Sequence, residues 1–169
     1  VGVMVPTRPR SSGYFPGGKL YSMSEPAEVT PKVTVITTVY NGERFLDEAL
    51  QSILSQDFSD LEYVLIDDAS SDGTWKLLQR WAELDDRIRI ERLPGHVGIA
   101  RAFNRGLALA RGRYICRHDA DDVHAGSRLR HQVEHLDSNP DTVLVTANYI
   151  DIDEFGIVLG RHVVENPPE

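Results

Sequence analysis

Short runs of apolar and β-branched residues alternate along this chain with segments in which apolar residues recur at helical spacing. The short runs have the length of strands and predict five of them, at 33–39, 61–66, 88–93, 114–116 and 142–150. The segments with helical spacing predict four helices, at 45–54, 75–84, 99–110 and 128–136. Strands that alternate with helices in this way predict an α/β fold with three layers, in which helices cover both faces of a mostly parallel sheet.

Residues 1–31 do not share this pattern. They contain five prolines, the pair Gly17-Gly18 and no sustained periodicity. We interpret them as a leader or linker, part of it derived from a vector or an upstream extension, with Met23 as a candidate natural start. The remainder, residues 32–169, is expected to form one domain, because it is long enough to bury a core without disulfides or metals.

The overall charge and the cysteine content restrict the classes of function. A net charge of −8 argues against broad nucleic-acid binding, which needs a basic surface to neutralise phosphates. The single cysteine, Cys116, rules out an internal disulfide and fits a reducing compartment. The apolar runs fall far short of the ~20 residues that span a bilayer, and the N-terminus has no hydrophobic signal region. These features together predict a cytoplasmic protein.

Polar and acidic residues gather where three of the predicted strands end. In open α/β sheets, ligands bind just outside the carboxyl ends of the strands. The three groups are Thr37, Thr38 and Tyr40; Asp67 and Asp68; and Asp119, Asp121 and Asp122. We therefore expect a binding site at this edge of the sheet.

The aspartates at 119–122 predict a metal site. Three carboxylates within four positions repel one another, so a cation would stabilise their ionised forms. Ligands that offer only oxygen favour Mg²⁺ or Mn²⁺, which often keep part of their coordination shell for substrate phosphates. The alternative is a solvated acidic loop or a helix N-cap, since aspartate is favoured there as well. The residue types alone leave these two interpretations about equally open.

The other candidate residues each have a structural alternative. Asp68 could accept an N–H from a nucleobase, or an Asx-turn could close the strand there. Tyr40 could stack on a base, or simply be an aromatic residue at the end of a strand. Residues 95–98 (GHVG) resemble a weak phosphate-binding loop before a helix, on which Arg101 and Asn104 lie one turn apart.

Two further patterns are discounted. Histidines at 118, 124, 131 and 135 cluster in the sequence, but they do not form the H-E-x-x-H pattern of zinc proteases, so a solvated helix face is the better interpretation. The pair Asp67-Asp68 could also belong to a receiver-like phosphoacceptor site. The third strand ends in Leu93-Pro94, which does not fit that arrangement.

Taken together, several segments resemble the family 2 inverting glycosyltransferases, which have the GT-A fold. The similar segments are residues 33–42 (VTVITTVYNG), 64–74 (VLIDDASSDGT), 98–106 (GIARAFNRG) and 112–122 (GRYICRHDADD), with Arg128-Leu129 and Asn139-Pro140 after them. They occur in the family's order over roughly residues 32–150. The resemblance implies a GT-A, Rossmann-like domain that binds a nucleotide sugar.

The resemblance also implies roles for the matching residues. The nucleoside would be contacted by Thr37, Thr38, Tyr40 and Asp68, with Tyr40 stacking on the base and Asp68 accepting a hydrogen bond from it. Arg101 and Asn104 would lie near the diphosphate or the sugar. Asp121 would bind Mn²⁺ or Mg²⁺ that bridges the diphosphate, with Asp119 on the ribose or in the metal shell. The metal would neutralise charge on the departing nucleoside diphosphate while an acceptor hydroxyl attacks with inversion.

The resemblance ends before the acceptor-binding half of the family. Inverting transfer needs a general base, and in the family that carboxylate lies beyond the metal motif. Asp151, Asp153 and Glu154 follow the fifth predicted strand, but nothing in the sequence marks any of them as the base. The chain is thus expected to be truncated, and the apolar surface left by the cut would favour a homodimer.

The expected activity is hexosyl transfer from a UDP-sugar, the favoured donor, to a saccharide or lipid-linked acceptor. The biological context would be the synthesis of polysaccharide or cell wall, with the parent enzyme peripherally associated with a membrane. One alternative is a non-catalytic module that binds nucleotide sugars, which the lack of an identifiable base would explain. A nucleotidyltransferase fits less well, because residues 40–43 (YNGE) lack the glycine-rich basic loop of that class.

Overall fold

The computed structural model describes residues 3–7 and 30–164. A five-stranded sheet in the order β1-β5-β2-β3-β4 forms its centre. The strands are β1 (Met4–Pro6), β2 (Val33–Val39), β3 (Leu61–Asp67), β4 (Ile88–Arg92) and β5 (Tyr114–Arg117). β2 pairs in parallel with both β3 and β5, and β3 pairs in parallel with β4, whereas β1 runs antiparallel to β5. The predicted α/β fold with a mostly parallel sheet is confirmed.

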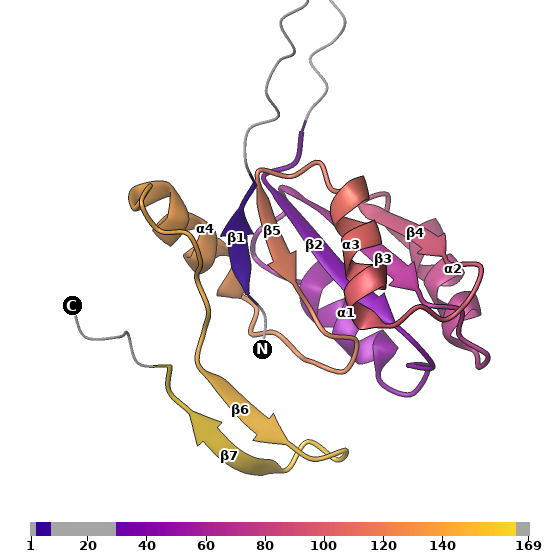
Figure 1. Ribbon diagram of the computed structural model, residues 1–169. Coiled ribbons are helices and arrows are strands. Elements are labelled where there is room, and N and C mark those ends of the chain that lie inside the picture. The colour runs from indigo at the N-terminus through magenta and orange to yellow at the C-terminus, as the bar shows by residue number, and fades with distance from the viewer. Residues whose placement is uncertain (1–2, 8–29, 165–169) are drawn as a thin grey trace, which may run out of the picture.

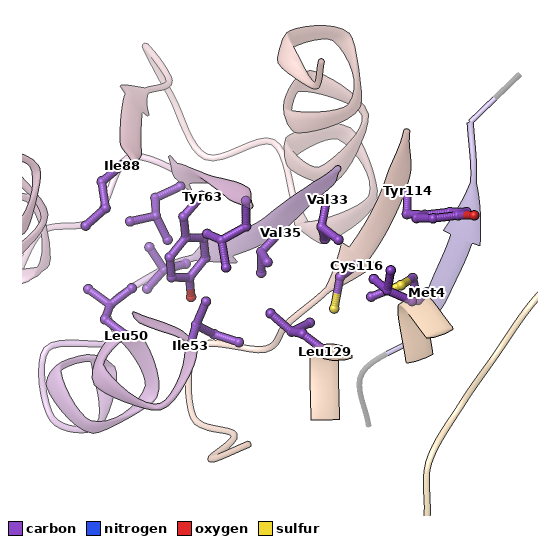
Figure 2. Packing of buried hydrophobic residues seen from close by; sticks show 14 of the residues in the cluster. Met4, Val33, Val35, Leu50, Ile53, Tyr63, Ile88, Tyr114, Cys116 and Leu129 are labelled. Carbon is purple, nitrogen blue, oxygen red and sulfur yellow. The ribbon is translucent and has the colours of Figure 1, made fainter. Parts of the chain in front are cut away.

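Four helices cover the two faces of this sheet (Figure 1). They are α1 (Leu46–Leu54), α2 (Thr74–Leu84), α3 (Ile99–Leu109) and α4 (Arg128–Ser138). Alternate side chains of a strand point to opposite faces, so β2 places Val33 and Val35 on one side and Ile36 on the other. Val33 and Val35 belong to the larger core with α1, α2 and α4 (Figure 2). Ile36 belongs to a smaller core with Ala102 of α3.

The first strand corrects part of the expected leader at 1–31. Met4 is fully buried, and residues 4–6 pair with residues 114–116 at the edge of the sheet. Pro6 is compatible with this position because an edge strand leaves some of its N–H groups unpaired. The short apolar strand covers the open edge of β5, which explains why it joins the domain. The remaining expected leader residues, 1–2 and 8–29, lie outside the described part of the chain, and Met23 lies there with them.

The predicted fifth strand at 142–150 is wrong. Val145 makes only an isolated bridge to Met4, and the sheet pairing ends there. The chain then forms a separate hairpin of β6 (Tyr149–Ile152) and β7 (Val158–His162), which Figure 1 shows apart from the main sheet. Its turn is set by Asp153, whose Oδ1 accepts hydrogen bonds from the backbone N–H groups of Phe155 and Ile157, both at 2.9 Å. Apolar periodicity predicts a strand but does not identify its partner.

The four helices are all shorter than a bilayer requires. No helix among the described residues is long and apolar enough to cross a membrane. In the hairpin of β6 and β7, Phe155, Leu159 and several neighbouring apolar side chains are exposed.

Candidate functional site

The parallel pairing brings the ends of β2, β3 and β5 to the same edge of the sheet. Val39 pairs with Asp67 at the end of β3, and Ile36 pairs with Arg117 at the end of β5. The three polar groups predicted from the sequence therefore lie beside one another, because each begins where one of these strands ends. The carboxyl edge of the sheet is the candidate site, as the parallel topology requires.

A depression of about 190 Å³ lies between the ends of β2 and β3. It is lined by Thr38, Val39, Tyr40, Asp68, His96 and Ile99. Three of the predicted contact residues, Thr38, Tyr40 and Asp68, are thus brought together. Tyr40 is 49% exposed, so one aromatic side chain is available to a planar ligand at this position.

His96 was not predicted as a site residue, although the loop that carries it was noted. Its ring lies against that of Tyr40, with 4.0 Å between the centroids, and its Nδ1 lies 2.9 Å from Asp68 Oδ2. His96 therefore links the exposed tyrosine to the buried aspartate. Only the spacing of Gly95 and Gly98 signalled this loop in the sequence, and it gave no indication of where the imidazole would lie.

The carboxylate of Asp68 holds this loop in place. Oδ1 accepts a hydrogen bond from Val97 N–H, and Oδ2 accepts one from Gly98 N–H, both at 2.8 Å. Gly98 adopts a φ of 86°, which a glycine reaches without steric cost. The loop at 95–98, expected to cradle a phosphate, instead directs these N–H groups at an aspartate that is only 2% exposed. Asp68 thus shapes the depression from beneath.

The turn after β3 keeps Asp68 in this position. The preceding residue, Asp67, accepts a hydrogen bond from Ser70 N–H at 3.0 Å. Between them, Ala69 has a φ of 63°, in the left-handed region that costs a residue with a side chain about 1 kcal/mol. Arg92 donates to the carbonyl of Ser70 at 2.6 Å and secures the turn from β4. The turn expected at Asp67-Asp68 is present, and it serves to orient Asp68.

Thr37 does not face the site. It is fully buried, and its hydroxyl donates to the carbonyl of His118 at 2.8 Å. The same hydroxyl lies 3.0 Å from both the Tyr63 hydroxyl and His118 Nδ1. The expected direct contact between Thr37 and a nucleoside is therefore corrected, because the side chain of a strand residue points to one face only. Thr37 instead anchors the residue that precedes the acidic loop.

His118 is the anchor of the acidic loop at 119–122. Its Nε2 lies 3.0 Å from the carbonyl of Asp122, which can only accept, so Nε2 carries the proton and Nδ1 accepts from Tyr63 at 2.7 Å. Burial lowers the pKa of His118 to about 4, against the smaller opposing effect of the hydrogen bond to Asp122. A neutral, hydrogen-bonded imidazole thus supports the loop from below.

The aspartates of this loop differ in their surroundings. Asp119 forms an ion pair with Arg117, at 2.8 Å from its Nη2. Asp121 is exposed and has neither an ion pair nor a side-chain hydrogen bond within residues 3–7 and 30–164. Over the same residues, no cluster of three or more histidine, cysteine, aspartate or glutamate side chains could hold a metal by itself. A cation at Asp121 would need further oxygen ligands from a substrate or from water.

Arg101 and Asn104 lie on the exposed surface of α3. They are one turn apart, as expected, but neither lines the depression beside Tyr40. The structure does not bring them into contact with the aspartates, and their proximity to a diphosphate stays a prediction. Of the four clustered histidines, His131 and His135 are exposed on α4, which agrees with the expected solvated face.

Comparison with known proteins identifies the family. The family model described as "Glycosyl transferase family 2" matches residues 34–168. The chain belongs to this glycosyltransferase family. EpsE of Bacillus subtilis, which carries the name of a glycosyltransferase, is 39% identical over 140 residues, or 82% of this chain and 50% of EpsE.

Two solved structures share the fold. TarS of Staphylococcus aureus, residues 1–349 in complex with UDP-GlcNAc, has a TM-score of 0.61 and 27% identity over 64% of this chain and 32% of its own. The mannosyltransferase PcManGT of Pyrobaculum calidifontis, in complex with GDP-Man and Mn²⁺, has a TM-score of 0.59 and 35% identity over 63% of this chain and 32% of its own. The family 2 chain thus spans half or less of the length of these relatives.

Proposed function

We propose that this chain binds a nucleoside diphosphate sugar across the carboxyl edge of the sheet, with the base beside Tyr40 and a divalent cation at Asp121. The observation that carries the proposal is the carboxylate of Asp121, which is exposed at the same edge as the Tyr40 depression and has no ion pair or side-chain hydrogen bond among the described residues. An exposed aromatic ring can stack on a base, and a carboxylate can hold the cation that a diphosphate needs. Similarity to proteins crystallised with UDP-GlcNAc or with GDP-Man and Mn²⁺ supports it.

The available ligands suit Mg²⁺ or Mn²⁺. These cations bind carboxylate oxygens and commonly take only one or two protein carboxylates, with phosphate and water oxygens completing the shell. Asp121 supplies one such carboxylate. Asp119 could supply a second if a cation displaced Arg117. When bound, the metal would neutralise negative charge on the departing nucleoside diphosphate.

We favour UDP as the nucleotide. Asp68 can accept an N–H from a base, because the backbone of Val97 takes one lone pair of Oδ1 and leaves the other available. Uracil presents a single N–H between two carbonyl groups, which suits such an acceptor beside a stacking ring. Tyr40 and its partner His96 would stack on the base, while Asp68 would accept the N–H of the base and also fix the loop that forms the wall of the depression.

For the whole protein, we propose inverting transfer of the sugar to an acceptor hydroxyl. Such transfer needs a base. Of the acidic residues after α4, Asp151 pairs with His162, Asp153 caps its turn, and Glu154 pairs with Arg44. None of these contacts assigns a catalytic base, so for this chain we propose donor binding. A turnover assay with a panel of nucleotide sugars separates a transferase from a module that only binds.

Replacing Asp121 with asparagine is expected to remove the metal dependence of nucleotide binding. In the unaltered chain, Mn²⁺ should raise the affinity for UDP at least tenfold, or about 1.4 kcal/mol. Asparagine keeps the shape of the side chain but removes the charge, so the same addition should raise affinity less than twofold. Isothermal titration with UDP, dTDP and GDP, with and without Mn²⁺, measures both values.

The matched control is Asp86→Asn, which alters an exposed carboxylate between α2 and β4, at the opposite edge of the sheet. In this variant, Mn²⁺ should raise the affinity for UDP as much as in the unaltered chain. An equal response to Mn²⁺ in the Asp121 and Asp86 variants would refute the assignment of the metal to Asp121. Tighter binding of GDP than of UDP would leave the metal assignment intact and overturn the choice of base.

A further inference from the structure

A second and larger cavity, of about 750 Å³, is lined in part by the acidic loop. Its walls come from the loop at 121–128, from one face of α4 and from residues 145–152. It meets the proposed donor site at Asp121 but includes neither Tyr40 nor Asp68. A ligand in this cavity could therefore approach a metal-bound diphosphate without occupying the position of the nucleoside.

Arg128 brings a guanidinium to this cavity. No carboxylate within the described ranges, 3–7 and 30–164, forms an ion pair with it, and its buried Nη2 has no hydrogen-bond partner there. Its Nη1 instead contacts the ring of His124 at 2.6 Å. Burial lowers the pKa of His124 to about 2, with smaller contributions from His118 and Arg128, so this ring is neutral. The guanidinium therefore contacts a neutral ring rather than a carboxylate.

Gln132 lies one turn further along α4 and on the same face as Arg128. It is only 4% exposed and lines the cavity, yet neither Nε2 nor Oε1 of its amide has a hydrogen-bond partner. Buried amides with both atoms unpaired are rare, because burying a polar group without a hydrogen bond is unfavourable. A ligand that both accepts and donates hydrogen bonds would satisfy this side chain.

We propose that this cavity binds the acceptor, and that the acceptor is a carbohydrate or polyol bearing a phosphate or carboxylate group. The unpaired atoms of Arg128 and Gln132 are covered by protein, so a ligand would draw these two side chains into the cavity. There Arg128 Nη2 and Gln132 Nε2 would donate to the anionic group, and Gln132 Oε1 would accept from a hydroxyl. The apolar side chains of Val145 and Ile152 in the opposite wall would contact the carbon faces of the ligand. The inference rests on the proposed donor function, because an acceptor must meet a donor bound at Asp121.

The anionic group belongs at the Arg128 end of the cavity rather than at the other. Asp121 lies where the cavity meets the proposed donor site, and its charge would repel an anion and favour hydroxyls there. Arg128 begins α4, so the dipole of the helix adds positive potential at its own end. A bound acceptor would therefore be oriented with a hydroxyl toward the donor.

The test is a titration of the chain with small-molecule probes. Two-dimensional NMR measures the chemical shifts of the backbone and side-chain amides at each step. The probes are glycerol 1-phosphate and glucuronic acid, with the neutral compounds glycerol and glucose as their partners. We expect at least one anionic probe to bind five times or more tightly than its neutral partner and to shift the side-chain amide of Gln132. Binding by only one anion identifies phosphate or carboxylate as the recognised group.

Two pairs of variants locate the binding. Arg128→Gln should weaken binding of the anion at least fivefold, whereas Arg130→Gln, on the same helix and paired with Asp57, should not. Gln132→Met should weaken it at least twofold, whereas Gln51→Met, on the exposed face of α1, should not. Should Arg128→Gln fail to fold, the Gln132 pair decides the question.

Three results would overturn the inference: equal binding of charged and neutral probes, unchanged binding in the folded variants at 128 and 132, or displacement of the anion by UDP and Mn²⁺. The last result would place the anion in the diphosphate site. Binding of UDP with Mn²⁺ is measured in the same samples. If UDP binds but the anionic probes do not, only the acceptor assignment fails, whereas the reverse result contradicts the proposed donor site.

Discussion

Replacing Gly112 with alanine should lower the free energy of unfolding by about 3 kcal/mol, the upper part of the range for overpacking a buried position. Gly112 precedes β5 and lies directly against β2. A β-carbon added there would lie 2.4 Å from the backbone nitrogen of Thr34 and 2.7 Å from the carbonyl carbon of Val33. Backbone atoms in the middle of a sheet cannot move aside as the end of a flexible side chain can. Part of the β2–β5 pairing must therefore be lost.

A buried network prevents the turn at Gly112 from moving away. Gly112 N–H donates to the hydroxyl of Thr34 at 2.8 Å, and that hydroxyl donates to Glu62 at 2.7 Å. Glu62 also accepts from Arg111 N–H at 2.6 Å. Burial acts to raise the pKa of Glu62, but the hydrogen bonds from Thr34 and Arg111 together outweigh it, so the pKa is lowered. Moving the turn outward would separate these partners.

Urea denaturation followed by circular dichroism measures the effect. The control is Gly95→Ala, because a β-carbon there would meet no atom within 4 Å and the free energy should change by less than ~0.5 kcal/mol. Equal stability of the two variants would contradict the close approach of the turn to β2. Because β5 leads into the acidic loop, the Gly112 variant should also bind UDP with Mn²⁺ more weakly wherever it remains folded.

In the sequence, Gly112 only began a segment that resembles the glycosyltransferase family. Its close contact with β2 joins residues 78 positions apart, and local periodicity contains no information about such a contact. The same reason explains the missed strand at residues 4–6, whose partner lies more than 100 residues away. Residues 33–39, by contrast, were predicted with the observed bounds, since a β-branched run determines its own local conformation.

The candidate site was predictable to the extent that it follows from parallel topology. Each strand end carries a polar group, and parallel pairing alone places Tyr40, Asp68 and Asp121 at the same edge. The direction of a side chain was less predictable. Thr37 and Thr38 are neighbours in sequence, but β2 turns Thr37 into the core and Thr38 toward the depression. His96 and Gln132 owe their positions to tertiary packing, so no local pattern marked them.

Lowering the pH from about 7 to about 4 should cost the folded chain about 3 kcal/mol through His118 alone. Its pKa falls from 6.5 to about 4 on folding, mainly because burial disfavours the charged ring, and each unit corresponds to about 1.4 kcal/mol. The unfolded chain binds the proton first. The contribution of neutral His118 to the free energy of unfolding is therefore complete above pH 6.5. It declines as pH falls toward 4 and changes no further below that value.

This acid sensitivity should extend to the acidic loop, because His118 joins it to the core through Asp122, Tyr63 and Thr37. Urea denaturation at several pH values, in EDTA so that no metal contributes, gives the slope. His118→Gln should be less stable at pH 7 yet show a shallower decline, whereas His131→Gln, exposed on α4, should keep the original slope. NMR titration of the His118 ring gives its pKa directly. A value near 6.5, or an unchanged slope in His118→Gln, would show that a buried neutral imidazole does not hold the loop that carries Asp121.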